Sequence, residues 1–235
     1  MKRYHWVGFL PFYLLAVLIF VGIAQLGSGA VTAVKENTPV PREYCFVIDA
    51  GHGGIDGGAT SCTGVLESTI NLEIALKLND LMRFLGFDTL MTRTTDTSIH
   101  TKGETIAAQK VSDLKERVRI VNETENAVLI SIHQNTFPDS RYGGAQVFYA
   151  ANGDSRQLAE KLQTSFAQTV NPGSKRKCKT SKGIYLMEHI EQMGLLIECG
   201  FLSNPTEEAK LRTPVYQKQL CCVIAATIGS YLSNT

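Results

Sequence analysis

The 235-residue sequence lacks a marked excess of charge of either sign, internal repeats and low-complexity segments. Its 23 Lys and Arg residues nearly balance its 22 Asp and Glu residues, which leaves a net charge of +1. A dedicated nucleic-acid binder needs surplus Lys and Arg to neutralise phosphates, so we expect no nucleic-acid partner. Apolar residues make up 44% of the chain and charged residues 19%, a composition that permits a sizeable folded core and excludes intrinsic disorder.

Closely spaced cysteine pairs are also lacking. The six cysteines form neither a zinc-ribbon nor a Cys-x-x-Cys pattern, so they predict no cysteine-based zinc or redox site. Cys199, Cys221 and Cys222 lie in apolar surroundings, where a free thiol packs as a small hydrophobe. Cys178 lies in a polar stretch and is the one candidate for disulfide pairing.

Only one long uncharged apolar run occurs, at Val7–Ala24, and Lys2 and Arg3 precede it. Its length is close to the ~20 residues that cross a bilayer, and the positive flank predicts that the rest of the chain is exported. We therefore expect a transmembrane anchor or a signal segment over residues 1–26. Small residues follow the run, so both an uncleaved anchor and a cleaved signal remain open. Residues 27–43, with Pro39 and Pro41, predict a linker, and residues 44–235 a single domain.

The domain alternates short β-branched apolar runs with longer helical patterns, which predicts an α/β fold. We expect a mostly parallel twisted sheet of about six strands with helices on both faces, and a surface loop over residues 94–111. The predicted strands cover residues 44–50, 87–93, 127–133, 144–150, 183–186 and 194–198, and the predicted helices cover residues 67–85, 112–124, 155–170 and 214–232.

Three polar residues fall where predicted strands end, and a fourth opens a helix. His52, His133 and Glu198 follow apolar runs, at the edge of a parallel sheet where ligands bind. Glu67 lies in the first turn of the helix over residues 67–85. Each has an ordinary structural explanation when taken alone: a turn, a helix dipole or a hydrogen-bonded core residue. Glu198 is the hardest to explain in this way, because a carboxylate beside so much apolar surface requires a cation or a proton.

Taken together, the four residues suit a catalytic zinc site. Two histidines and a carboxylate, here His52, His133 and Glu67, form a three-ligand set with an open fourth position. Glu198 is then free to accept and donate protons, which predicts metal-assisted amide hydrolysis. The His-Glu-x-x-His motif of many metalloproteases is absent, so another zinc scaffold is expected.

Four segments together resemble the zinc-dependent N-acetylmuramoyl-L-alanine amidases of the amidase 3 family: residues 47–54, 66–67, 131–135 and 198–204. The resemblance spans about residues 44–232. It implies hydrolysis of the amide between muramic acid and L-alanine in peptidoglycan, with Zn²⁺ bound by His52, Glu67 and His133 and with Glu198 catalytic. Arg117 and Asn135 match recurrent positions of the family whose roles the sequence leaves unassigned.

The short architecture, one apolar N-terminal segment and one catalytic domain, is similar to the sporulation- and germination-specific (CwlD-like) members. In these, removal of peptides prepares muramic lactam in the spore cortex. The expected partners are peptidoglycan and, through the N-terminal segment, a membrane; whether an accessory protein takes part stays open. Two alternatives also remain: a peptidoglycan-binding module with a vestigial metal, and a zinc peptidase acting on stem peptides.

One basic cluster has no assigned role. A solvated loop is the ordinary interpretation, and contact with an acidic polymer is the alternative. Its members are Lys175, Arg176, Lys177, Lys179 and Lys182.

Overall fold

The computed structural model describes residues 44–233. The expected anchor or signal segment (1–26) and the expected linker (27–43) lie outside the described residues. Among residues 44–233, no helix combines the length and the apolar character that crossing a membrane requires.

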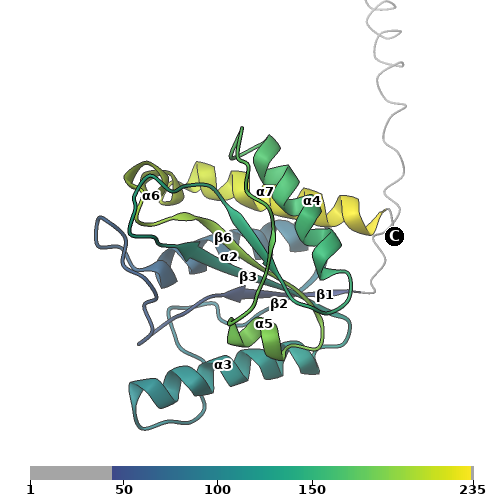
Figure 1. Ribbon diagram of the computed structural model, residues 1–235. Helices are drawn as coiled ribbons and strands as arrows, with labels where there is room; N and C mark the ends of the chain where they lie inside the picture. Colours follow the sequence, from purple (N-terminus) through teal and green to yellow (C-terminus); the bar gives the residue numbers. More distant parts are fainter. Residues whose placement is uncertain (1–43, 234–235) are drawn as a thin grey trace, which may run out of the picture. The chain divides into compact units, whose positions relative to one another are not determined.

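A six-stranded sheet organises the described residues (Figure 1). Its spatial order is β2-β1-β3-β6-β4-β5; β2, β1, β3 and β6 run parallel, whereas β4 is antiparallel to β6 and β5 is parallel to β4. The predicted mostly parallel α/β sheet is therefore confirmed. The strands are β1 (Cys45–Ala50), β2 (Asp88–Met91), β3 (Ala127–Asn135), β4 (Gln146–Tyr149), β5 (Lys179–Thr180) and β6 (Met193–Phe201).

Helices cover both faces of the sheet. The helices are α2 (Glu67–Phe84), α3 (Ile106–Glu123), α4 (Ser155–Gln168), α5 (Tyr185–His189), α6 (Pro205–Leu211) and α7 (Pro214–Leu232). In Figure 1, α3 and α5 lie on one side of the sheet, and α2, α4 and α7 lie on the other. Two apolar cores result, because successive strand residues point to opposite faces. Ile48 and Ile130 enter the core under α2 and α7, while Val47 and Leu129 enter the core under α3.

Helix α3 begins at Ile106, six residues before the predicted start at position 112, and so takes up part of the predicted loop over residues 94–111. Thr105 caps it, with its Oγ1 accepting a hydrogen bond from the Ala108 amide at 3.2 Å. The first turns are exposed, with Ile106 itself 54% accessible. Because they carry no buried stripe, hydrophobic periodicity could not reveal them.

The prediction of an edge strand over residues 183–186 is wrong. The edge strand is β5, and Tyr185 instead opens α5. Leu186, Met187 and Ile190 pack into the core under α3 with helical spacing, and the Tyr185 and His189 rings stack at 3.9 Å. A short apolar run does not distinguish a strand from a helix by its period.

Helix α6 was not predicted, although its start is legible. The Asn204 side chain accepts hydrogen bonds from the amides of Thr206 and Glu207, and Pro205 occupies the first helical turn. Asn followed by Pro is a recognised helix start. The closing helix over residues 214–232 was predicted with its observed bounds.

Candidate active site

His52 lies in a tight turn directly after β1, with a positive φ of 61°. Such a conformation costs a residue with a side chain about 1–3 kcal/mol and needs support from its surroundings. Two guanidinium groups supply it. Arg117 donates to the carbonyls of Ala50 (2.9 Å) and His52 (2.8 Å), and Arg93 donates to the carbonyls of Ala50 (2.9 Å) and Gly51 (3.1 Å). The backbone that presents His52 is thus held on both sides.

The buried charge of Arg117 is balanced by two carboxylates. Its Nη1 pairs with Asp49 of β1, and its Nε lies 2.5 Å from Asp113. Asp49 also accepts hydrogen bonds from Ser131 (2.6 Å) and Thr92 (2.8 Å). Although burial opposes ionisation, Arg117 and these hydroxyl groups hold the pKa of Asp49 below its usual range. Arg117, unassigned from the sequence, is therefore a structural support of the His52 turn.

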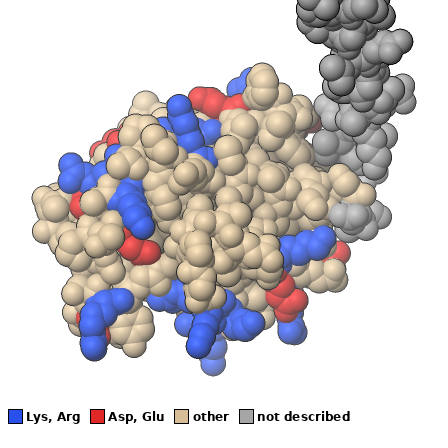
Figure 2. All heavy atoms as spheres, turned by 90° about the horizontal axis from the view of Figure 1, so that it is seen from above, with Lys and Arg blue, Asp and Glu red and all other residues tan. Residues whose placement is uncertain are grey.

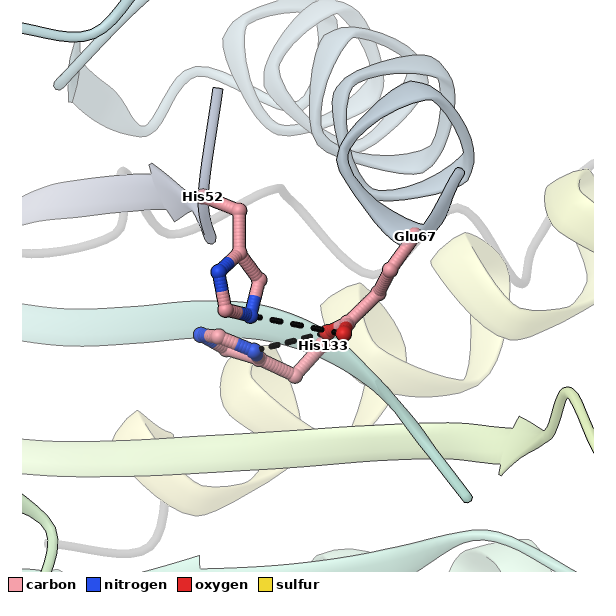
Figure 3. A group of neighbouring side chains, drawn as sticks. All are labelled: His52, Glu67 and His133. Carbon is pink, nitrogen blue, oxygen red and sulfur yellow. Dashed lines mark hydrogen bonds and ion pairs between the residues drawn. The ribbon is translucent and has the colours of Figure 1, made fainter. Parts of the chain in front are cut away.

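Glu67 opens α2, and its carboxylate lies beside both histidine rings and contacts each of them (Figure 3). Its Oε1 lies 2.9 Å from His133 Nδ1, and its Oε2 lies 3.3 Å from His52 Nε2. The amides of Gln134 (3.1 Å) and Ala59 (3.0 Å) donate to the same two oxygens. Burial opposes ionisation of this carboxyl, but the hydrogen bonds from both histidines prevail and hold its pKa far below the usual range. Glu67 is therefore an anion in a site built for positive charge.

Two glycines make room for this cluster. A Cβ at Gly51 would lie 2.2 Å from His133 Nε2. A Cβ at Gly58 would lie 2.6 Å from Glu67 Oε2, and Gly58 also has a φ of +68°. Both positions exclude larger residues because a side chain would collide with the cluster itself.

Asp56 orients the His52 ring. Its Oδ2 lies 2.9 Å from His52 Nδ1, and its Oδ1 pairs with Lys110 of α3 at 2.8 Å. Because an ionised carboxylate only accepts, Nδ1 carries the proton and Nε2 is directed toward Glu67. Burial disfavours the imidazolium, yet Glu67 and Asp56 together raise the pKa of His52 to about 9. Asp56 was not predicted as a site residue; its position four residues after His52, within the same glycine-rich turn, was the available signal.

The three predicted ligands form a cluster that fits a divalent metal ion. One ligand atom from each of His52, Glu67 and His133 lies within 4.8 Å of the others. Bonds of about 2.0–2.2 Å in a tetrahedron separate ligand atoms by roughly 3.4 Å, and the contacts of Glu67 with His133 (2.9 Å) and His52 (3.3 Å) are of this order. Two imidazoles and one carboxylate also constitute a known catalytic zinc set. The site is therefore suited to a metal ion with one coordination position left open.

Glu198 lies on β6 directly opposite His133 of β3. Its Oε2 is buried and has no hydrogen-bond partner among residues 44–233. Burial, reinforced by the negative charge of Glu67, raises its pKa to about 7, although both histidines oppose the shift. A carboxyl group with this pKa can exchange a proton near neutral pH, as a general acid–base requires.

Comparison with known proteins shows the family to which the chain belongs. Residues 46–230 match the N-acetylmuramoyl-L-alanine amidase family. The chain belongs to this family. It is accordingly an amidase of cell-wall peptidoglycan, as the four sequence motifs implied.

Individual relatives cover more than four fifths of the chain. A germination-specific N-acetylmuramoyl-L-alanine amidase of Bacillus subtilis is 32% identical over 235 residues, which span 99% of this chain and 97% of the relative. The CwlD amidase of Clostridioides difficile, solved in complex with the GerS lipoprotein, is 35% identical with a TM-score of 0.78, covering 81% of this chain and 99% of that one. An N-acetylmuramoyl-L-alanine amidase structure from Clostridium difficile is 31% identical with a TM-score of 0.71, covering 83% and 99%.

Proposed function

We propose that this amidase is zinc-dependent, with His52, Glu67 and His133 as the metal ligands and Glu198 as the catalytic acid–base. The observation that carries the proposal is the register of β3 and β6, which sets a carboxyl of raised pKa beside a ligand of the three-residue cluster. A bound zinc ion supplies Lewis acidity toward the scissile carbonyl. The chain's own groups supply the proton transfers.

Glu198 accepts a proton from the attacking water and delivers it to the departing amine of L-alanine. A pKa of about 7 suits both steps, because the group changes protonation state readily at neutral pH. The contact between His133 and Glu67 fixes the position of the Glu67 carboxylate, and Asp56 holds His52 in one tautomer.

The germination-specific relative and the CwlD structure support a proposal for the biological setting. We infer that the enzyme is exported, is held at the membrane by residues 1–26, and prepares muramic lactam in the spore cortex. Because the CwlD amidase was solved with the GerS lipoprotein, we also propose an accessory lipoprotein partner for this chain.

Incubation of the full-length protein with purified peptidoglycan, with and without chelator, tests the reaction. New L-alanine amino termini without new reducing sugars, abolished by the chelator and restored by zinc, are the expected result. Cleavage inside the stem peptide would indicate a zinc peptidase instead, and zinc-dependent sedimentation without products would indicate a binding module.

The variant Glu198→Gln tests the division of roles. It should retain one zinc per chain and lose turnover by about 10²–10⁴-fold, as expected for removal of a general acid–base. His133→Ala, the matched ligand variant, should lose both zinc and turnover. Loss of zinc from Glu198→Gln would identify Glu198 as a ligand and contradict the assignment.

A further inference from the structure

The basic cluster divides into two kinds of residue. Its four lysines (Lys175, Lys177, Lys179 and Lys182) are exposed, as a solvated loop requires, whereas Arg176 is half-buried. In Figure 2, Lys and Arg side chains project around the rim of the displayed face with Asp and Glu side chains among them. An exposed lysine in such surroundings needs no further explanation. A half-buried guanidinium does.

Arg176 is held by three contacts from two segments, residues 143–146 and β6. Its Nε donates to the Gly143 carbonyl at 2.8 Å, and its Nη1 donates to Gln146 Oε1 at 3.2 Å. Its guanidinium carbon lies 4.8 Å from the ring centroid of buried Phe201. These contacts fix the direction of the guanidinium and leave donors at its outer end.

None of these contacts supplies a negative charge. No acidic side chain among residues 44–233 forms an ion pair with Arg176. The oxygens of Glu207 accept hydrogen bonds from the amides of Gly144 (2.6 Å) and Phe201 (2.9 Å), and neither oxygen forms an ion pair with Arg176. Arg176 is thus a half-buried guanidinium of fixed direction, without an ion pair among residues 44–233 and with free donors, which suits it to bind an anionic group.

The sheet register places this guanidinium beside the reacting groups. Gln146, which binds Arg176, is the direct partner of Glu198 across β4 and β6. Side chains of directly opposed residues share a face and have Cβ atoms about 5 Å apart. Arg176 therefore lies one hydrogen-bonded side chain beyond Glu198, whose own Oε2 is unpaired. An acidic group with an unpaired oxygen and a basic group with donors to spare therefore flank Gln146.

We propose that Arg176 binds a carboxylate of the stem peptide. It would thereby select substrates that carry an acidic residue at the second stem position, next to L-alanine. The proposal rests on the amidase function described above. If Glu198 serves the amide at the first stem residue, a carboxylate on the second residue lies roughly 7 Å further along an extended chain. Arg176 lies on the far side of Gln146 from Glu198, so a stem peptide that extends from Glu198 across Gln146 brings this carboxylate toward the guanidinium.

Binding to a hydrolytically silent protein tests the proposal independently of turnover. The full-length Glu198→Gln protein is titrated with two muramoyl peptides that differ only in a free carboxylate or a carboxamide on the second stem residue. We expect the carboxylate form to bind roughly 10-fold or more tightly, the difference made by a charge-assisted bidentate contact. Adding Arg176→Gln should abolish the preference by weakening the carboxylate form alone.

Two further variants keep the test decisive. Lys175→Gln, an exposed neighbour, should leave the preference unchanged, and Arg176→Lys should retain only part of it because the planar fork is lost. Thermal unfolding of each variant shows whether it is folded. An unchanged preference in folded Arg176→Gln overturns the proposal, as does equal weakening of both peptides. Failure of the wild-type protein to hydrolyse either peptide would count against the amidase assignment, whereas the binding preference would still decide the role of Arg176.

Discussion

Replacement of Arg117 by methionine is the sharpest test of how the His52 turn is supported. The substitution keeps much of the side-chain volume and removes the charge. It leaves Asp49 buried without its counter-charge and removes the donor of the His52 carbonyl. Breaking a buried ion pair from one side costs about 3–5 kcal/mol, a large part of the 5–15 kcal/mol that stabilises a typical domain.

Urea unfolding in the presence of a chelator measures this loss without a contribution from bound metal. With a slope near 3 kcal/mol per molar urea, the midpoint of Arg117→Met should fall by roughly 1–2 M. Arg119→Met is the matched control on the same helix, since Arg119 pairs with Glu116 and Glu123 on the exposed surface. Its midpoint should stay at the wild-type value. Equal midpoints for the two variants would refute the idea that Arg117 stabilises the fold.

The ion pair between Arg117 and Asp49 also predicts how stability depends on pH in the acid range. Arg117 lowers the folded-state pKa of Asp49, so Asp49 contributes stability above its unfolded pKa of about 3.9 and loses that contribution as pH falls through the lower folded value. In Arg117→Met the folded-state pKa of Asp49 should rise. The acid unfolding midpoint should therefore move to higher pH, and an unshifted acid limb would show that Asp49 does not depend on Arg117.

Two predictions concern metal binding. Asp56→Asn should weaken zinc affinity by about 10–100-fold, because the partner that orients His52 loses its charge. Competition with a zinc-responsive dye measures this affinity, and Asp88→Asn on β2 is the control. Equal zinc affinities for the two variants would show that Asp56 does not support the site. Zinc must also displace the proton from His52, whose pKa is about 9, so affinity should fall about tenfold for each pH unit below 9. A flat affinity profile between pH 7 and 9 would contradict the His52–Glu67–Asp56 geometry.

The four site residues that could be predicted from the sequence share one property: each lies next to the start or end of a predicted strand or helix. His52 and His133 follow apolar runs, Glu198 ends one, and Glu67 opens a helix, so the parallel topology alone gathers them at one edge. Asn71, Arg93 and Gln134 support the same cluster but carry no such mark. Asn71 looks like one polar position on an amphipathic helix until its amide is seen to contact Glu67 Oε1 at 3.2 Å.

The backbone conformation at His52 could not be predicted from the sequence either. The left-handed turn at His52 depends on Arg93 and Arg117, which lie 41 and 65 residues further along the chain. No local propensity encodes contacts at that separation. Short elements were misjudged for a related reason: α5 has five residues, too few for a period of 3.6 to stand out from a period of 2.

The reversed direction of β4 explains why the two sides of the site differ. If β4 were parallel to β6, it would present its last residue at this edge; being antiparallel, it presents Gln146, its first. The proposed metal ligands come from the turn after β1, from α2 and from β3 on one side of Glu198, while Gln146 and the segment bearing Arg176 lie on the other. Under both proposals, metal affinity and substrate preference depend on separate parts of the chain. Substitution of Arg176 should alter which peptides bind without changing zinc affinity, and substitution of Asp56 should do the reverse.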